Sequence, residues 1–333
     1  MTRPIRIGIN GFGRIGRTIL RQLMTTRRGL PIEVAAINDI APLDSCAYLF
    51  AYDSVFGPFP GPVTGANGAL VIGETRIPVT HSTDLADSDL AGIDIWLECA
   101  GHAKTRAIAE RGLAAGAGRV LISGPSDAAD ATIVLGANDA LLADQPIVSN
   151  ASCTTNAEAP LLRLLHDRLG IEAAHLTTIH CYTASQPMID APRGDLARSR
   201  AGALSMVPTT TSATELIRRV LPDLKGQLSS ASVRVPVASV SAVDMTATLS
   251  HPVTHAELIA LLRSADPAII GHIDAPLVSS DLRGRPESLI VALPETMLTT
   301  DRQIRIFGWY DNEWGFSARM IDMVLRMGPQ HRS

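Results

Sequence analysis

The segment that most constrains the fold is residues 5–23, where three glycines separate an apolar strand pattern from a helical one. Gly11, Gly13 and Gly16 have the G-x-G-x-x-G spacing. A side chain at Gly11 would block the tight turn, one at Gly13 would keep the backbone from a pyrophosphate, and one at Gly16 would lift the helix off the sheet. We therefore predict a strand, turn and helix that bind a dinucleotide at the helix N-terminus. The candidate cofactor-binding residues of this motif are Gly11, Phe12, Gly13, Arg14, Ile15 and Gly16.

An acidic residue after the next strand pattern indicates which dinucleotide would bind. Residues 32–38 form that pattern, and Asp39 follows Gly16 by about 20 residues, where a ribose-binding acid is expected. A carboxylate there accepts a hydrogen bond from a 2′-hydroxyl and repels a 2′-phosphate, so NAD is predicted rather than NADP. A glycine-rich turn without a ligand is the alternative interpretation, but the strand, helix and acid together favour a cofactor site.

The order of strand and helix patterns predicts an α/β chain, and 333 residues are enough for two domains. Short apolar strands that alternate with helices are typical of a parallel sheet. Such patterns cover residues 5–10, 32–38, 93–100, 119–123 and 146–150. Longer patterns rich in Val, Thr and Ile favour a second sheet, mixed or antiparallel, and cover residues 174–180, 229–250 and 302–312. Residues 181–211 show neither period and predict a functional loop or disorder.

A cysteine in front of a helical pattern is the candidate nucleophile. Cys153 lies in the string SNASCTTN and is followed by leucines at helical spacing, so its thiol is expected near a helix N-terminus. The positive end of a helix and a nearby imidazole can lower a thiol pKa. His180 ends a strand pattern, and a strand returning beside the helix would bring its imidazole to the sulfur as a base. Each residue alone could be structural, since buried cysteines usually pack as small apolar groups.

The other cysteines predict neither a disulfide framework nor a metal site. Cys46, Cys99 and Cys181 have no repeated spacing, and Cys181 is expected to pack on the opposite face of its strand. The CAGH string at 99–102 lacks the further ligands of a zinc site. Without a membrane-length apolar run or a signal-peptide pattern, a cytoplasmic protein is predicted. A net charge of −4 does not favour a nucleic-acid surface.

Four strings, INGFGRIGR, SNASCTTN, RVPVASVSAVD and WYDNEWGFSARMID, closely resemble the phosphorylating glyceraldehyde-3-phosphate dehydrogenase family, in the family's order and over essentially the whole chain. The resemblance implies a Rossmann NAD-binding domain with a doubly wound parallel sheet over residues 1–152. It implies a catalytic α+β domain over 153–316 and a C-terminal helix, 317–333, that returns to the first domain. It also implies a homotetramer in which residues 181–211 lie near a neighbouring subunit's cofactor.

The same resemblance implies roles for individual residues. Cys153 would be the nucleophile, His180 the base, and Asn312 the side chain that holds the nicotinamide carboxamide. The other implied residues are Ser123 for the cofactor, Thr183, Arg198 and Arg234 for the substrate's phosphate, and Ser152, Thr154 and Thr211 for the attacking phosphate, beside which Ser212 is a further candidate hydroxyl.

The implied reaction is the oxidation of glyceraldehyde 3-phosphate to 1,3-bisphosphoglycerate through a cysteine thiohemiacetal and thioester. The chain departs from the family at Ser212, where glycine is usual, and at Pro187, where lysine is common. Similar enzymes that oxidise erythrose 4-phosphate, or that use arsenate in place of phosphate, are alternatives. A non-catalytic NAD-binding or RNA-binding protein is a further alternative, with a basic patch formed by Arg193, Arg198 and Arg200.

Overall fold

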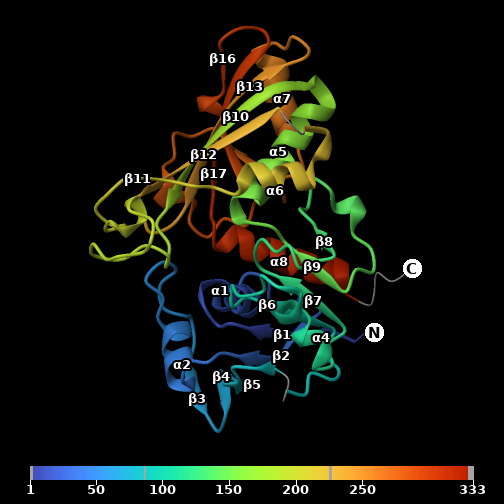
Figure 1. Ribbon diagram of the computed structural model, residues 1–333, viewed down its shortest axis with the longest axis vertical. Helices are drawn as coiled ribbons and strands as arrows, with labels where there is room; N and C mark the ends of the chain where they lie inside the picture. The colour runs from blue at the N-terminus through green and yellow to red at the C-terminus, as the bar shows by residue number, and fades with distance from the viewer. Residues whose placement is uncertain (1–2, 86–87, 225–226, 329–333) are drawn as a thin grey trace. The chain divides into compact units, whose positions relative to one another are not determined.

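The computed structural model of the chain describes residues 3–85, 88–224 and 227–328. The chain divides into two compact units, each with a sheet of its own (Figure 1). Unit 1 comprises Met1–Ile133, Ala140–Ser152 and Ser317–Ser333, and unit 2 comprises Val134–Asp139 and Cys153–Phe316. None of the helices within the described ranges has the length and apolar character needed to cross a membrane.

In the part of unit 1 that the structure describes, the sheet has nine strands and confirms the predicted doubly wound parallel arrangement. In sheet order they are β3 (Val63–Ala66), β4 (Ala69–Ile72), β5 (Thr75–Thr80), β2 (Ile32–Asn38), β1 (Ile5–Asn10), β6 (Ile95–Glu98), β7 (Arg119–Ile122), β9 (Ile147–Ser149) and β8 (Ala131–Thr132). All neighbours from β5 to β8 are parallel. The chain order reverses between β1 and β6, and the carboxyl ends of strands at such a point form a crevice suited to ligands.

An antiparallel edge, β3–β4–β5, extends this sheet and was not among the predicted strands. Asn67 and Gly68 join β3 to β4, with φ of 48° and 71°. A two-residue type I′ hairpin turn requires positive φ at both central positions, and Asn-Gly is its preferred sequence.

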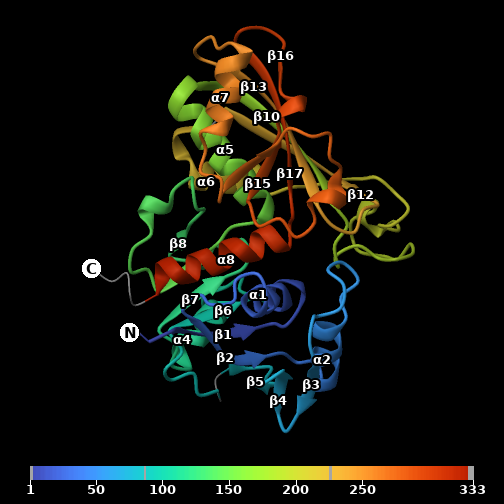
Figure 2. The ribbon, with the colours of Figure 1, turned by 180° about the vertical axis from the view of Figure 1, so that it is seen from behind.

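The helices of unit 1 are α1 (Arg14–Met24), α2 (Leu43–Ala51), α3 (Arg106–Ala109) and α4 (Arg111–Ala114), together with most of α8 (Trp314–Met327). A 3-10 turn, η2 (Asp139–Leu141), precedes β9. Two arginines attach α8 to this unit: Arg27 pairs with Asp322 at 2.5 Å, and Arg119 donates to the carbonyl of Met327 at 3.2 Å. In Figure 2, α8 accordingly lies beside α1 and β7.

The sheet of unit 2 is mixed, as predicted. Its path is β11 (Val207–Thr209), β12 (Leu228–Val235), β10 (Ile171–Cys181), β13 (Ser241–Leu249), β17 (Gln303–Tyr310), β15 (Leu289–Ala292) and β14 (Ile270–Ile273), and β16 (Met297–Leu298) pairs with β17. The pattern at 229–250, expected as one segment, is two strands that flank β10, with β12 parallel and β13 antiparallel to it.

Within the described residues, three helices belong wholly to unit 2: α5 (Cys153–Leu169), α6 (Ala213–Val220) and α7 (His255–Arg263). Helix α5 packs on one face of the sheet, against β10, β13, β14 and β15. Along β17 the buried residues alternate with partly exposed ones, and buried Tyr310 faces α5. Short 3-10 turns complete the unit: η3 (Ala197–Ser199), η4 (Pro222–Leu224), η5 (Ser279–Leu282) and η6 (Leu293–Glu295).

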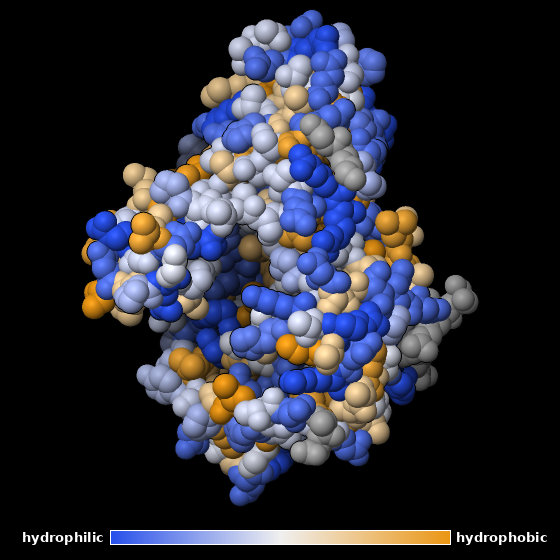
Figure 3. All heavy atoms as spheres, viewed as in Figure 1, coloured by the Kyte–Doolittle hydropathy of each residue, from blue (hydrophilic) through white to orange (hydrophobic). Residues whose placement is uncertain are grey.

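The segment 181–211 is largely irregular, but it is not without strand: η3 and β11 interrupt it, and β11 pairs with β12. Several large apolar side chains on this segment are exposed, and orange residues are visible on the corresponding protrusion in Figure 3. They are Met188, Ile189, Leu196, Leu204 and Met206.

Candidate active site

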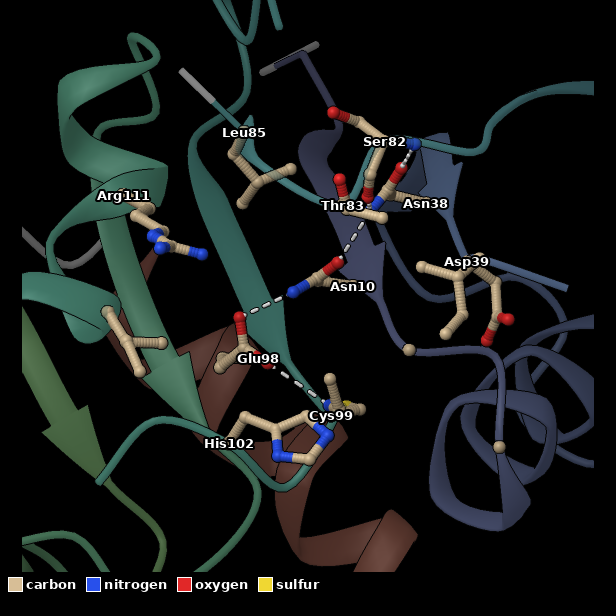
Figure 4. Close-up of a pocket in the computed structure, with 15 residues that line it drawn as sticks. Asn10, Asn38, Asp39, Ser82, Thr83, Leu85, Glu98, Cys99, His102 and Arg111 are labelled. Atoms are coloured by element: carbon tan, nitrogen blue, oxygen red, sulfur yellow. Dashed lines mark hydrogen bonds between the residues drawn. The ribbon is translucent and has the colours of Figure 1, made fainter. Parts of the chain in front are cut away.

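A pocket of about 290 Å³ lies in unit 1 at the carboxyl ends of β1, β2 and β6 (Figure 4). This is the position at which a doubly wound sheet binds nucleotides. Its lining residues are Asn10, Gly11, Gly13, Asn38, Asp39, Ile40, Ser82, Thr83, Leu85, Glu98, Cys99, Ala100, His102, Ile108 and Arg111.

The glycine turn between β1 and α1 forms one wall of the pocket. Gly11 has a φ of +86°, and a Cβ there would lie 2.5 Å from the backbone nitrogen of Ala100. A Cβ on Gly16 would lie 2.3 Å from the carbonyl oxygen of Gly11, so α1 could not approach the turn. Gly13 instead faces open space, since a Cβ added there would meet no heavy atom of the described residues within 4 Å. The exposed backbone at Gly13 therefore fits the close approach of a pyrophosphate.

Asp39 closes the same turn from the end of β2. One carboxylate oxygen accepts from the backbone nitrogen of Phe12 at 2.6 Å, and the other accepts from that of Ala41 at 2.8 Å. A carboxylate has about four acceptor positions, so Asp39 can accept a further hydrogen bond from a ribose hydroxyl. This geometry fits NAD.

The other predicted cofactor residues of unit 1 lie outside the set that lines this pocket. Phe12 is buried and stacks on Phe50, with ring centroids 5.9 Å apart. Arg14 pairs with Asp53 at 2.5 Å, and its neighbour Ile15 lies in the first turn of α1. Ser123 follows β7 and donates its backbone N–H to the carbonyl oxygen of Glu98 at 3.0 Å. These residues support the turn and the strand ends from outside the pocket.

A polar network at the base of the pocket was not predicted. Asn10, Asn38 and Glu98 each end a strand, and Figure 4 shows them linked in a row. Asn38 donates to Asn10 at 2.8 Å, and Asn10 donates to Glu98 at 2.6 Å. Burial raises the pKa of Glu98, while the hydrogen bonds from Asn10 and Ala100 act in the opposite direction. The sequence did contain a signal for this network, since each of the three strand patterns has a polar residue at its end or, for Glu98, two residues before it.

In unit 2 the predicted cysteine and histidine lie together. Cys153 is the first residue of α5, and His180 lies near the end of β10. The Cys153 Sγ is 3.7 Å from the His180 Nε2. Ala151, two residues before the cysteine, has a φ of +55°, a conformation that costs alanine of the order of 1–2 kcal/mol. The chain turns sharply there and enters α5 with the thiol at its start.

The protonation of this pair differs from the expectation of a lowered thiol pKa. Burial raises the pKa of Cys153, and hydrogen bonds from Thr154 and the charge of Arg234 only oppose that effect. Burial and the adjacent Arg234 lower the pKa of His180 to about 4. The pair is therefore a neutral thiol beside a neutral imidazole, because desolvation of the thiol outweighs the hydrogen bonds from Thr154 and the charge of Arg234.

Asn312 is fixed by two hydrogen bonds to its side-chain oxygen. The Cys181 thiol lies 3.1 Å from this oxygen and the Ser241 hydroxyl 3.3 Å from it, and both donate to it. Burial raises the pKa of Cys181 to about 12, so this thiol remains a donor. Cys181 is buried, as packing requires, and its sulfur also contacts a predicted site residue, a contact that the sequence did not predict. The amide nitrogen of Asn312 is left to donate elsewhere.

The predicted phosphate-binding residues form two groups. Arg234 lies against His180, and Thr154 contacts the hydroxyl of Tyr310 at 3.0 Å. Arg198 instead binds the end of β11 and the residue after it, donating to the Thr210 hydroxyl at 2.7 Å and to the Thr209 hydroxyl.

The remaining residues of this set are exposed or partly exposed. Thr183 contacts Ser185 at 2.9 Å, and the Thr211 hydroxyl accepts from Ala213 at 3.1 Å. Ser212 is the residue before α6, and Ser152 is the residue before α5. No group of three metal-ligating side chains occurs among the residues that the structure describes.

A buried acid behind the thiol was also missed. Glu158 is fully buried on α5, one turn after Thr154, and one of its oxygens accepts from Thr178 on β10 at 3.2 Å. Its other oxygen has no hydrogen-bond partner within the described part of the chain. Burial raises the pKa of Glu158 to about 8, so the carboxyl group is largely protonated at neutral pH. The sequence did contain a signal for this buried acid, because Glu158 interrupts an otherwise apolar face of the predicted helix.

These two units define a class of protein: an oxidoreductase with a dinucleotide site on a doubly wound sheet and, in a second unit with a mixed sheet, a thiol–imidazole pair between the start of a helix and the end of a strand. Family models match both parts. The model described as glyceraldehyde 3-phosphate dehydrogenase, NAD binding domain, matches residues 5–106, and the corresponding C-terminal domain model matches residues 152–312.

Curated relatives agree over nearly the whole chain. Glyceraldehyde-3-phosphate dehydrogenases from Cereibacter sphaeroides and Pseudomonas aeruginosa are both 44% identical to it, covering 97% of this chain and 98% of theirs. Glyceraldehyde-3-phosphate dehydrogenase 1 from Streptomyces avermitilis is 41% identical over the same shares. The chain belongs to the glyceraldehyde-3-phosphate dehydrogenase family and is an NAD-dependent oxidoreductase.

Proposed function

We propose that the chain catalyses the phosphorylating oxidation of glyceraldehyde 3-phosphate to 1,3-bisphosphoglycerate. The observation that carries this proposal is the 3.7 Å approach of the Cys153 Sγ to the Nε2 of a neutral His180. A neutral imidazole can accept the thiol proton while the sulfur attacks an aldehyde carbon. The names of the relatives support the triose phosphate as substrate.

The residues of unit 2 account for the covalent steps. The sulfur of Cys153 bonds to the aldehyde carbon, and its proton moves to His180. The backbone N–H of Cys153, at the start of α5, and the imidazolium stabilise the oxyanion of the resulting thiohemiacetal. The imidazolium gives its proton to the oxyanion, which forms the hydroxyl of the thiohemiacetal, and the neutral His180 takes this proton back as the carbonyl reforms and the hydride leaves the carbon. Bound NAD supplies the hydride acceptor, and Asn312 would hold its carboxamide.

The second half-reaction transfers the acyl group from sulfur to phosphate. An oxygen of inorganic phosphate attacks the thioester carbon, and the thiolate of Cys153 leaves and regains a proton. We assign Thr183, Arg198 and Arg234 to the substrate's phosphate, because guanidinium groups match phosphate oxygens in charge and geometry. The hydroxyls assigned to the attacking phosphate are those of Ser152, Thr154, Thr211 and Ser212. Residues 1–152 and 317–333 would form the cofactor domain, and residues 153–316 the catalytic domain.

The test is formation of NADH with glyceraldehyde 3-phosphate, NAD and phosphate. We expect the triose to give the higher kcat/KM, with erythrose 4-phosphate and arsenate measured in parallel. A higher kcat/KM for the erythrose substrate, or for arsenate, would retain the chemistry and contradict the assigned substrate or oxyanion. No NADH formation with any pair would contradict the proposed activity.

The alternative of a basic RNA-binding patch gains no support from the structure. Arg200 pairs with Asp190 at 2.8 Å, and Arg198 lies 3.8 Å from Asp195. Each of these cations is thus beside a carboxylate of the same loop, which reduces the net charge available to a phosphate backbone. A cytoplasmic location stays a prediction.

We also propose a homotetramer in which the loop 181–211 contacts neighbouring subunits. Met188, Leu196 and Leu204 on this loop are 81–89% exposed, and burying such large apolar side chains against another chain would be favourable. The variant Leu196→Asp is expected to reduce the mass measured by light scattering from four chains to two or one. Leu141→Asp is the control, since Leu141 is 63% exposed but lies in unit 1. A wild-type monomer, or an unchanged mass for Leu196→Asp, would contradict this assembly.

A further inference from the structure

The ends of three neighbouring strands bring Cys181, Ser241 and Asn312 together in unit 2. Strand β13 lies between β10 and β17 in the sheet and is antiparallel to both. Cys181 is the last residue of β10, Ser241 is the first residue of β13, and Asn312 follows β17 by two residues. The register of the sheet therefore places a thiol, a hydroxyl and an amide at the same end of the three strands.

Two hydrogen-bond donors meet at the side-chain oxygen of Asn312. The Cys181 Sγ is 3.1 Å from this oxygen, and the Ser241 Oγ is 3.3 Å from it. The Ser241 hydroxyl accepts from the backbone nitrogen of Cys181 at 3.1 Å, so its own hydrogen is available for Asn312. Burial raises the pKa of the Cys181 thiol to about 12, and this thiol therefore also carries a hydrogen at neutral pH. Flipping the amide would deprive both hydrogens of this acceptor and would place the amide nitrogen against the sulfur, which accepts only weakly.

The backbone on either side of Asn312 is held independently of these donors. The preceding residue, Asp311, is buried, and its carboxylate accepts hydrogen bonds from three backbone nitrogens. These nitrogens belong to Gly284, Glu313 and Trp314, at 2.9, 3.0 and 2.8 Å. Asn312 itself is 8% exposed, and none of the described residues accepts a hydrogen bond from its amide nitrogen. With the oxygen fixed, the amide presents N–H donors to a bound molecule.

The backbone of Cys181 contacts the thiol–imidazole pair separately from its side chain. The Cys181 carbonyl oxygen is 2.7 Å from the His180 Nδ1 and 3.0 Å from the Arg234 Nη1. This contact fits a hydrogen on Nδ1 and a lone pair on Nε2, the nitrogen that faces Cys153. A substitution of the Cys181 side chain keeps the carbonyl. The sulfur can therefore be removed without removing the contact that orients the imidazole.

We propose that Cys181 is a positioning residue: together with Ser241 it fixes the Asn312 amide with its oxygen inward, so that the nitrogen donates to a carbonyl oxygen of the bound cofactor. The inference rests on the proposed function, in which Asn312 holds the nicotinamide carboxamide. That group offers both a carbonyl oxygen and an NH2 group, and an asparagine free to flip could pair with either of them. The thiol and the hydroxyl remove this choice, so the carboxamide should bind in one orientation.

Equilibrium binding of three ligands to Cys181→Ala tests this role without turnover. NAD has the whole carboxamide, 3-acetylpyridine adenine dinucleotide keeps the carbonyl oxygen but has a methyl group in place of NH2, and ADP-ribose lacks the nicotinamide ring. Loss of one hydrogen bond should raise the Kd of NAD and of the acetylpyridine analogue alike, by about fivefold, and leave that of ADP-ribose unchanged.

Three results with these ligands would overturn the proposal. An unchanged Kd for NAD would show that the thiol does not position the amide. A loss of affinity for NAD but not for the acetylpyridine analogue would show that Asn312 presents its oxygen to the NH2 group. An equal loss for ADP-ribose would show a general structural defect. Cys46→Ala, which removes a buried thiol from α2, is the control and should bind all three ligands as the wild type does.

A double-mutant cycle tests whether the sulfur acts through Asn312. Asn312→Ala removes the amide, and adding Cys181→Ala to it should cause no further loss of NAD affinity. A further loss as large as that of Cys181→Ala alone would make the thiol independent of Asn312 and contradict the positioning role. Cys181→Ser keeps a hydrogen for the amide oxygen and should bind NAD within about twofold of the wild type. If it bound as weakly as Cys181→Ala, the volume of the sulfur and not its hydrogen would matter.

Failure of this inference and failure of the proposed function are distinguishable, because binding is measured apart from catalysis. If the protein forms NADH from glyceraldehyde 3-phosphate but Cys181→Ala binds NAD as the wild type does, the positioning role alone is overturned. If the three ligands respond as expected in a protein that oxidises neither aldehyde, the positioning role stands and the proposed function is contradicted.

Discussion

Replacing Cys153 with serine is expected to lower kcat by about 10⁴-fold or more while leaving the affinity for NAD unchanged. A serine hydroxyl is a far weaker nucleophile than a thiol, and the neutral His180 that faces it at 3.7 Å is too weak a base to ionise it. The glycine turn and Asp39 belong to unit 1, and Cys153 does not line their pocket. The substitution should therefore affect the chemical steps and not the binding of the dinucleotide.

Steady-state NADH formation and calorimetric titration with NAD measure the two quantities. Cys46→Ala is the matched control, because Cys46 is a buried thiol on α2 whose pKa burial raises to about 11. This variant should keep kcat close to that of the wild type. Turnover retained by Cys153→Ser would contradict its role as nucleophile, and a parallel loss of NAD affinity would indicate a structural defect instead.

Replacing Glu158 with glutamine is expected to stabilise the protein at pH 8 and above but not near pH 5. The pKa of the buried carboxyl is about 8 in the folded chain, against 4.5 for an ordinary glutamate. Between these pH values the folded state keeps the proton and the unfolded state releases it. The free energy of unfolding therefore falls as pH rises through this window, by about 5 kcal/mol in total. Above pH 8 both states are ionised and the loss is complete.

Denaturant midpoints of the wild type and Glu158→Gln, measured from pH 5 to pH 9, test this expectation. The two midpoints should coincide near pH 5 and separate with increasing pH, because glutamine does not titrate. Glu158→Leu should show the same divergence, since it also removes the buried acid. Glu215→Gln is the control: the Glu215 side chain is 80% exposed on α6, so its midpoint should follow that of the wild type. Midpoints that stay parallel over the whole range would show that Glu158 is not held protonated.

Much of the fold followed from local sequence patterns. The glycine turn, the parallel strands of unit 1 and the mixed sheet of unit 2 are confirmed. The β3–β4 hairpin was missed although Asn67 and Gly68 are a strong turn signal. The division of residues 229–250 into β12 and β13 was harder to predict from the sequence, because both segments have the same apolar period. Only their pairing with opposite edges of β10 shows that they are two strands.

For a similar reason, the sequence predicted individual residues of the candidate site but not the contacts between them. Cys153, His180 and Asp39 could be proposed from their places at the ends of helical and strand patterns. The contact of Arg234 with the His180 ring joins residues 54 positions apart, and it depends on the register of two parallel strands. The network of Asn10, Asn38 and Glu98 likewise forms only when three strand ends meet.

The sequence by itself determined the features that depend on neighbours in the chain: the turn that requires Gly11, the helix that begins at Cys153, and the family to which the chain belongs. Only the tertiary structure decided the protonation of the site. Cys153 and Glu158 have raised pKa values, and His180 has a lowered one, because folding removes these groups from water. Desolvation depends on what surrounds a group in space, and that environment is assembled from strands and helices distant in sequence.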